Sequence, residues 1–263
     1  KMFQPVPTVA LEIASQTGES DISFYVAVPQ NLETVFEKYV QGVYPSAVVQ
    51  KVPEDYTVFE PQGQSSGAYV RLRENFLFPI ATYQKLEKDP LAVITNNLSK
   101  IVAEEGAAIQ IIIRPLSRLN LRTMGEKALG KIREGKLPRT AVAEATRGIA
   151  GEIIAEILHH QNQKSKDDLT AKKEQGFDQA IYDAISSKIQ KQPFEANIRL
   201  ISCAPNKNRA DEILSHLTSA FSQFSLLGFN GFEEKRVSNS KLKRFMYEFS
   251  FRVFNPKQKN ILN

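Results

Sequence analysis

The residues most suggestive of catalysis form a near-match to a phosphate-binding loop. Gly125, Gly130 and Lys131 have the spacing G-x-x-x-x-G-K, in which backbone N–H groups and a lysine cradle nucleotide phosphates. Ile132 stands where a magnesium-binding hydroxyl should follow, and the charged residues inside the match are typical of a surface helix. A phosphate loop also needs a strand that runs directly into it, and none is expected before Gly125. We therefore expect no nucleotide site here.

A second pattern is typical of di-iron helical bundles. Glu156 and His159 have the spacing E-x-x-H, but such a site needs a second pair and two further glutamates, and no partner pair exists in this chain. His159 and His160 instead end an expected helix, where positive charge is favoured. The third histidine, His216, is expected on the solvent side of its helix.

A single cysteine, Cys203, limits the remaining chemistry. It cannot form an internal disulfide, and it cannot supply the spacing of a zinc site. No serine–histidine–aspartate arrangement, G-x-S-x-G pattern or carboxylate pair stands out. Cys203 lies in an apolar run and is expected to be a small core residue, which fits a reducing compartment. The sequence therefore predicts no catalytic, cofactor-binding or metal-binding residues in this segment.

The net charge of +5 is concentrated in two basic runs. Residues 116–141 hold seven basic and two acidic side chains, and residues 235–259 hold eight basic and one acidic side chain. Such patches attract nucleic acid or anionic lipid, and a solvated protein face has the same composition. The candidate contacts in the two runs are Arg118, Arg122, Lys127, Lys131, Lys235, Lys241, Lys243 and Arg244.

Residues 1–115 alternate strand and helix patterns. Apolar alternation predicts a strand over 22–28, and further strands are predicted over 6–14, 47–52, 69–78 and 107–114, the last a continuous apolar run. Helical spacing predicts helices over 32–43 and from Asp89-Pro90 to before Gly106, the second with an aspartate cap and a proline in its first turn. From Ile22 the order is β-α-β-β-α-β. This order predicts an α+β fold with a ferredoxin-like unit in residues 1–115, preceded by an extra N-terminal strand.

The rest of the chain divides into two further regions. Helical spacing within residues 116–192, interrupted by the polar stretch 161–173, predicts a helical insertion that forms a hairpin. Residues 193–263 predict a second α+β half, with strands at 195–204 and 232–237 and a helix at 209–224. The stretch 241–254 fits a helix or a strand. Because the chain opens on Lys1 and closes on an apolar segment, we expect both ends to be cut from a longer protein.

Ten short stretches also carry a family resemblance: ISFYVAVP at 22–29, VYPSA at 43–47, EDY at 54–56, FPIATY at 78–83, DPLA at 89–92, AIQIIIRP at 108–115, KQPFEANIRL at 191–200, AFSQF at 220–224, FNP at 254–256 and ILN at 261–263. In their order and spacing they resemble the region that precedes the motor domain in conjugation-type DNA-transfer ATPases of the HerA–FtsK class, which are bacterial type IV secretion-like proteins. The resemblance covers nearly the whole chain except residues 119–176.

The resemblance implies a non-catalytic accessory domain of a membrane-associated ATPase, serving oligomerisation, docking or substrate guidance. ATP and magnesium are then expected only in a motor domain outside this sequence. The implied partners are that motor domain, like subunits and envelope secretion components, with DNA and an anionic membrane surface as further candidates. The implied location is the cytoplasmic side of the inner membrane, peripheral or tethered. Lys235, Lys241, Lys243 and Arg244 would lie near the motor, where DNA could pass.

Two alternatives of another class remain open from the sequence. The chain could be a free-standing nucleic-acid-binding module that uses both basic runs. It could instead be a scaffold on the inner membrane, with the basic stretch of the insertion against anionic lipid.

Overall fold

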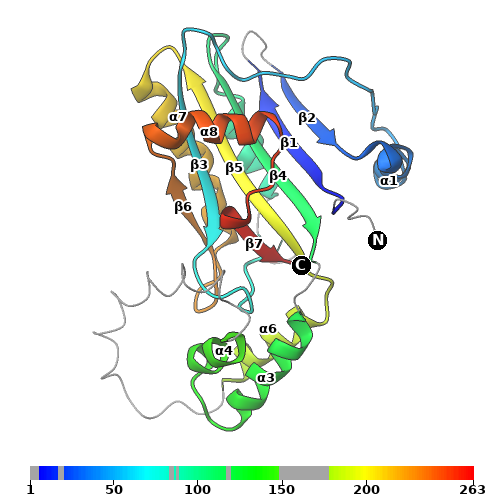
Figure 1. The fold of residues 1–263 in the computed structure, drawn as a ribbon, viewed down its shortest axis with the longest axis vertical. Coiled ribbons are helices and arrows are strands. Elements are labelled where there is room, and N and C mark those ends of the chain that lie inside the picture. Colours follow the sequence, from blue (N-terminus) through cyan, green and yellow to red (C-terminus); the bar gives the residue numbers. More distant parts are fainter. Residues whose placement is uncertain (1–5, 17–20, 83–85, 87–88, 117–119, 148–177) are drawn as a thin grey trace.

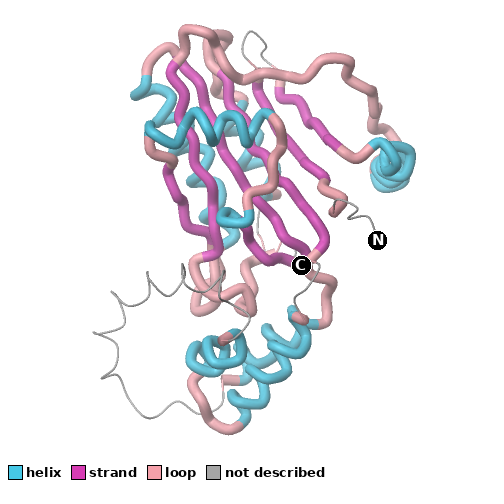
Figure 2. The backbone as a smooth tube through the Cα atoms, in the orientation of Figure 1, coloured by secondary structure: helices cyan, strands magenta, loops and turns pink. Residues whose placement is uncertain are grey.

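A computed structural model describes residues 6–16, 21–82, 86, 89–116, 120–147 and 178–263. Within these ranges a seven-stranded sheet carries helices on both faces, and a small group of helices lies beyond one end of the sheet (Figure 1). Figure 2 shows the same layers coloured by secondary structure. The chain therefore has the α+β fold that its sequence predicts.

The sheet is antiparallel, with the order β2-β1-β4-β5-β3-β6 and with β7 beside β5. Its strands are β1 (Val9–Ser15), β2 (Ile22–Ala27), β3 (Gln64–Leu72), β4 (Gly106–Pro115), β5 (Phe194–Ala204), β6 (Phe232–Arg236) and β7 (Lys259–Leu262). β4 and β5 pair along their whole length, although the helical insertion separates them in sequence. Residues 1–115 and 193–263 therefore share one sheet.

Two β-α-β units interlock at the centre of this sheet. β3 and β4 flank helix α2 (Pro90–Leu98), β5 and β6 flank helix α7 (Lys207–Ser219), and β5 lies between β4 and β3. The order β4-β5-β3-β6 is that of a split β-α-β arrangement. The sequence predicted this unit for the segment from Ile22 to residue 114, which is wrong. Residues 47–52 form no strand, β2 lies at the sheet edge, and β3 to β6 make the arrangement instead. Pro45 and Pro53 bracket that stretch, and no strand in the described chain pairs with it.

One face of the sheet packs on α2 and α7. Alternate residues of the central strands point to this face and form an aliphatic core with the two helices. Its fully buried members include Ile109, Leu200, Leu214 and Leu217. The Asp89 side chain caps α2 by accepting a hydrogen bond from the Leu91 N–H at 2.9 Å, and Pro90 occupies the first turn, as predicted. The predicted helix at 209–224 is α7 followed by a 3₁₀ turn, Ala220–Phe224.

The opposite face is covered by helix α8 (Asn239–Ser250), which crosses in front of the strands in Figure 1. Phe245 and Phe249 point inward and pack against Ala108 and Ile201. The ambiguous stretch 241–254 is thus helical through Ser250, because residues spaced by four bury one face. Arg252, at a φ of 51°, then turns the chain back toward the sheet. A 3₁₀ turn, Pro256–Gln258, leads into β7.

The predicted strand 69–78 is also shifted. β3 begins at Gln64 and ends at Leu72. Beyond it the buried Asn230 side chain accepts from the Glu74 N–H and donates to the carbonyls of Glu74, Asn75 and Phe78. These bonds satisfy backbone groups that a longer strand would have paired, so the chain turns instead.

Three helices form the described part of the insertion: α3 (Leu121–Arg133), α4 (Pro138–Thr146) and α6 (Gln179–Ile189). They share a small apolar core, which Leu77, Phe78 and Ile261 join from outside the insertion. Helices α3 and α6 approach closely at Gly125, where an added Cβ would collide with Ile189. The E-x-x-H pattern at Glu156, His160 beside it and the predicted hairpin tip lie outside the described residues.

Helix α1 (Glu33–Val43) stands apart from the layers. It follows a 3₁₀ turn, Gln30–Leu32, and lies beyond the β2 edge of the sheet in Figure 1. None of its residues is buried. Across the described ranges, no helix has both the length and the apolar character needed to cross a bilayer.

Candidate nucleic-acid interface

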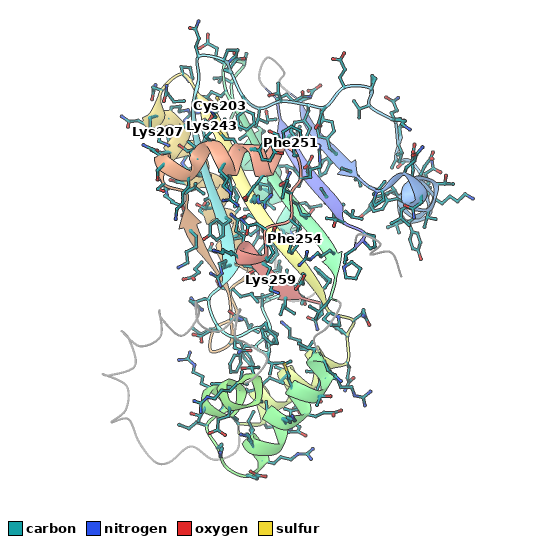
Figure 3. All side chains as sticks on the ribbon, in the orientation of Figure 1. Cys203, Lys207, Lys243, Phe251, Phe254 and Lys259 are labelled. Carbon is teal, nitrogen blue, oxygen red and sulfur yellow. The ribbon has the colours of Figure 1, made fainter. Side chains whose placement is uncertain are left out.

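The outer face of α8 combines basic and aromatic side chains. Lys241, Arg244, Tyr247 and Phe251 follow one another at intervals of three, three and four residues, so they form one stripe along the helix and its end. Lys243 lies exposed beside this stripe, and Figure 3 shows Lys243 and Phe251 toward opposite ends of α8. These five residues are here named the α8 surface.

The aromatic part of the α8 surface is open to solvent. Tyr247 is 58% exposed and Phe251 is 67% exposed, and their ring centroids are 4.6 Å apart. Arg244 donates from Nε to Glu248 Oε1 at 3.0 Å, yet its side chain remains 82% exposed. Cations that follow a phosphate backbone, next to aromatic faces on which bases stack, are the combination that binds single-stranded nucleic acid.

Lys235 contributes less than its sequence position suggests. It pairs across β6 and β3 with Tyr69, so its side chain points to the α8 side of the sheet. However, it forms an ion pair with Glu233 at 2.9 Å and is partly buried. Of the four candidates in the second basic run, Lys241, Lys243 and Arg244 therefore form the exposed group.

A buried arginine holds the chain around α8 on the sheet. Arg199, on β5, is 0% exposed. It donates to the side chains of Gln110, Gln258 and Asn197 at 3.3, 2.9 and 3.3 Å. It also donates to the carbonyls of Glu248 and Val253 at 2.9 and 2.7 Å. Because these acceptors come from β4, β5, α8 and the segment after it, one side chain fixes the positions of four chain segments.

The charge of Arg199 is only partly balanced. The nearest carboxylate oxygen is Glu248 Oε2, 3.7 Å from its Nη2. Burial lowers the pKa of Arg199 to about 10, against the opposing attraction of Glu248. A buried charge is costly unless hydrogen bonds replace its water, and the five acceptors around Arg199 do so.

A second arginine extends this network toward the sheet edge. Arg252 donates to Glu12 on β1 at 2.8 Å and to both carboxylate oxygens of Asp55 at 2.6 and 2.8 Å. Glu12 in turn accepts from Gln110 at 2.6 Å. The hydrogen bond from Arg252 is the main cause that lowers the pKa of Asp55. The two arginines and their partners form one continuous polar layer between α8 and the sheet, here named the polar layer.

The polar layer continues to β7. Glu195 on β5 accepts from Arg114 at 2.6 Å and from Lys259 at 2.8 Å. The Arg114 guanidinium also lies over the Phe254 ring, 3.7 Å from its centroid. Figure 3 labels Phe254 and Lys259 on this returning segment. Ion pairs and a ring contact thus hold the chain from α8 to β7 along its length.

The first basic run lies elsewhere in the molecule. Figure 1 places α3 beyond the end of the sheet, away from α8, so the two runs do not meet. Arg122 pairs with Glu126 at 2.8 Å, and Lys131 and Lys136 both bind Glu144. These two lysines, Lys131 first, lower the pKa of Glu144 to about 2. Lys127 is exposed, and Arg118 lies outside the described residues.

A groove of about 760 Å³ runs between α3, α6 and the segment 190–193 that leads into β5. Its lining includes Arg122, Glu126 and Lys191, together with Arg133, which lies over the Tyr182 ring at 4.9 Å from the centroid. Most of these cations have a carboxylate or ring partner within the groove region. The charge balance of the groove is similar to that of the α8 surface, where Arg244 is likewise paired with a carboxylate, but its lining holds one aromatic ring where the α8 surface holds two exposed neighbouring rings.

Among the described residues, those of the near-match to a phosphate loop and Cys203 occupy structural positions. Gly125 to Lys131 lies inside the continuous helix α3, and Gly125 serves the close contact with Ile189. Cys203 is buried, and its sulfur accepts the Glu60 N–H at 3.4 Å. His216 is exposed near the end of α7, as predicted. In the part of the chain that the structure describes, no cluster of three or more histidine, cysteine or acidic side chains could hold a metal ion.

The fold and the α8 surface define an α+β domain with an exposed basic and aromatic helix. A family model described as a domain of unknown function, DUF8128, matches residues 4–262, and the chain belongs to this family. No curated protein and no solved structure matches the chain.

Reasoning from sequence missed the aromatic half of the α8 surface and the whole polar layer. The sequence of 241–254 fits both a helix and a strand, so it does not predict on which side the rings of Tyr247 and Phe251 lie. Had the helical period been chosen, their spacing of four from each other would have placed both rings on one side. Arg199 gave no such signal, since a polar residue in an alternating strand is usually interpreted as facing solvent.

Proposed function

We propose that the chain is a non-catalytic accessory domain of a membrane-associated, type IV secretion- or conjugation-like ATPase. Of the three roles that the resemblance implies, the geometry best supports substrate guidance, with single-stranded DNA passing along the α8 surface. In this proposal the domain acts on the cytoplasmic side of the inner membrane, beside its motor domain, like subunits and envelope components. ATP and magnesium belong to the motor.

One observation carries the proposal. Three exposed cations and two exposed aromatic rings share the outer face of α8, whose inner face the polar layer holds on the sheet. A surface that guides a strand must keep its contacts in a fixed register. The bonds from Arg199 to Glu248 and Val253 give α8 and its following turn such a fixed position.

The experiment is a salt titration of the binding of a fluorescent oligothymidylate by the whole chain, followed by anisotropy. The test variant is Lys241→Glu with Lys243→Glu and Arg244→Glu. We expect the wild type to bind at low ionic strength, and the variant to lose about two units of the log–log salt slope, because each phosphate contact contributes about 0.7. The matched control, Lys100→Glu, changes an exposed cation away from α8 and should leave the slope unchanged.

The same assay separates the alternatives. A free-standing nucleic-acid module that uses both basic runs predicts that Arg122→Glu with Lys127→Glu also weakens binding, whereas substrate guidance along α8 predicts little change. A membrane scaffold predicts that the wild type co-sediments with vesicles rich in anionic lipid and not with neutral vesicles. The Arg122→Glu, Lys127→Glu variant should no longer co-sediment with the anionic vesicles. Absence of any oligonucleotide binding at low ionic strength would contradict the proposed role of α8.

A further inference from the structure

The two edges of the sheet differ sharply in charge. β6 forms one edge, and four of its five residues, from Glu233 to Arg236, are charged. β2 forms the other edge with the sequence ISFYVA, which contains no charge, proline or glycine. Proteins protect exposed edges from pairing with another chain by such charged or interrupting residues. β6 has such residues, and β2 has no charged or interrupting residue of its own.

Within the part of the chain that the structure describes, the outer edge of β2 has no backbone partner. Its residues pair with β1 on one side, from Ile22 opposite Ser15 to Ala27 opposite Ala10. Among the described residues, no further backbone hydrogen bond joins β2 to another segment. Within the described chain, the backbone donors and acceptors on this side of an uncharged strand are therefore unpaired.

Apolar side chains surround this free edge. Phe24 and Val26 lie opposite Ile13 and Leu11, so they share the sheet face that α2 and α7 cover farther along. At the start of β2, Ile22 packs against this core, but farther along the strand Phe24 remains 61% and Val26 45% exposed. A face that forms the core under the helices thus continues uncovered to the edge.

Helix α1 adds a second uncovered apolar surface beside the first. Its apolar positions from Leu32 to Val43 repeat at helical spacing, yet the helix has no buried residue. Tyr39 is 73% exposed and Val43 is 65% exposed. A short helix gains most of its stability from packing of its apolar side, so α1 lacks its main packing partner within the described chain.

The charge of residues 22–52 limits the kinds of partner that β2 and α1 can bind. Residues 22–52 contain two acidic and two basic side chains, Glu33, Glu37, Lys38 and Lys51. This balance gives no attraction for nucleic acid or anionic lipid. The charged edge β6 of another copy would bury its charges against an uncharged strand, at a high desolvation cost. The best match on this molecule for an uncharged edge is the same edge of a second copy.

We infer that β2 pairs antiparallel with β2 of a second copy across a twofold axis, and that α1 of each copy packs on the exposed apolar face of the other. Twofold pairing of identical surfaces is the most common form of oligomer. Exposed apolar side chains of both elements are available to such an interface: Phe24 and Val26 on β2, and Val35, Tyr39 and Val43 on α1.

This inference rests on the proposed function, whose oligomerisation role it assigns to a surface. The surface is separate from α8, so the two can fail independently. A dimer that binds no DNA would contradict only the proposed guidance of DNA along α8. A monomer that binds DNA would contradict only the inferred dimer.

The test measures the mass of the whole chain in solution by light scattering and sedimentation across a range of concentrations. We expect a dimer for the wild type, and a dissociation constant weakened at least about tenfold for Val26→Lys, which places a charge at the pairing edge. Tyr39→Lys on α1 should weaken it as well, and its high exposure means that folding is not at risk. Val102→Lys is the matched control, because Val102 is 58% exposed and lies outside this region.

Hydrogen exchange gives a second readout on the same samples. The amides of β2 should become protected as the concentration rises through the dissociation constant, while those of β6 should not change. A wild type that is monomeric at all concentrations would overturn the inference. So would an oligomer that persists unchanged in both Val26→Lys and Tyr39→Lys, since another surface would then hold it.

Discussion

The two faces of β5 are built from opposite chemistry. Toward α2 and α7, Ile198 and Leu200 join an aliphatic core. Toward α8, Asn197 and Arg199 belong to the polar layer. Aliphatic contacts tolerate small shifts of their partners, whereas each hydrogen bond of a buried arginine requires one position of its acceptor. We conclude that the aliphatic face contributes mainly to overall stability, and that the polar layer, together with the inward rings of Phe245 and Phe249, sets where α8 lies.

The largest effect is expected from Arg199→Ala, which breaks the polar layer. It leaves buried acceptors on Gln258, Asn197 and two carbonyls without their donor. The free energy of unfolding should fall by about 3–5 kcal/mol in urea denaturation. Hydrogen exchange should show α8 amides losing protection before those of β4. A loss below about 1 kcal/mol, or α8 as protected as β4, would contradict the assigned role of Arg199.

Leu200→Ala changes the neighbouring residue, on the other face of the same strand. Leu200 is fully buried, so the cavity should cost about 3 kcal/mol. Here we expect protection to fall together in α8 and β4, because the loss is of overall stability. If α8 opened first in this variant too, the contrast between the two faces would not hold.

Lys188→Met tests a buried charge that lacks the partners of Arg199. Lys188 is 5% exposed, and its Nζ is 3.5 Å from the Phe78 carbonyl. Burial, reinforced by Lys191, lowers the pKa of Lys188 from 10.5 to about 8. At pH 7 the folded chain therefore buries a charge that the unfolded chain keeps in water, and the variant should be about 1–2 kcal/mol more stable.

The pH dependence of that difference has a defined sign. Between pH 8 and pH 10.5 the unfolded chain holds more protons at this position, so wild-type stability should rise toward that of Lys188→Met. Urea denaturation of the wild type and of Lys188→Met from pH 7 to pH 10 measures the gap between their free energies of unfolding. A gap that stays constant or widens would show that Lys188 is not buried as a charge.

The smallest effect is expected from Asp55→Asn, at the exposed end of the polar layer. The Asp55 side chain is 55% exposed, so solvent screens its pairing with Arg252 and the cost should stay below about 1 kcal/mol. Because Arg252 lowers the pKa of Asp55, this contribution is present above pH 3.8 and is lost as the pH falls through the lower folded pKa. Acid unfolding curves of the two proteins should therefore converge at low pH. Divergence toward low pH would contradict the pairing.

The sequence predicts the elements better than their assembly. Local signals placed the Asp89 cap of α2, the strand β6 and most helices, because capping and periodicity are short-range. The interlocked β-α-β units were assigned to the wrong residues, since element order alone does not show that β5 enters between β4 and β3. Val48 and Val52 have strand propensity but are exposed in a loop, so propensity was overridden by the absence of a partner strand.

The polar layer lay beyond prediction for a similar reason. Alternation in β5 shows that Asn197 and Arg199 share a face, but not that α8 covers it. The basic half of the α8 surface could be predicted from charge, whereas its separation from the α3 run required the positions of both helices (Figure 1). Composition identifies charged side chains, and only packing shows which of them, such as Lys131 or Lys235, are already paired.

The central claim is that the fixed outer face of α8 binds a single strand by stacking as well as charge. The most direct measurement is the affinity of the whole chain for an oligothymidylate and for a duplex of equal length at one ionic strength, in the wild type and in Tyr247→Ala with Phe251→Ala. We predict that the wild type prefers the single strand, and that the variant loses at least about tenfold in single-strand affinity while duplex binding hardly changes. Equal wild-type affinity for both, or an unchanged variant, would contradict the claim.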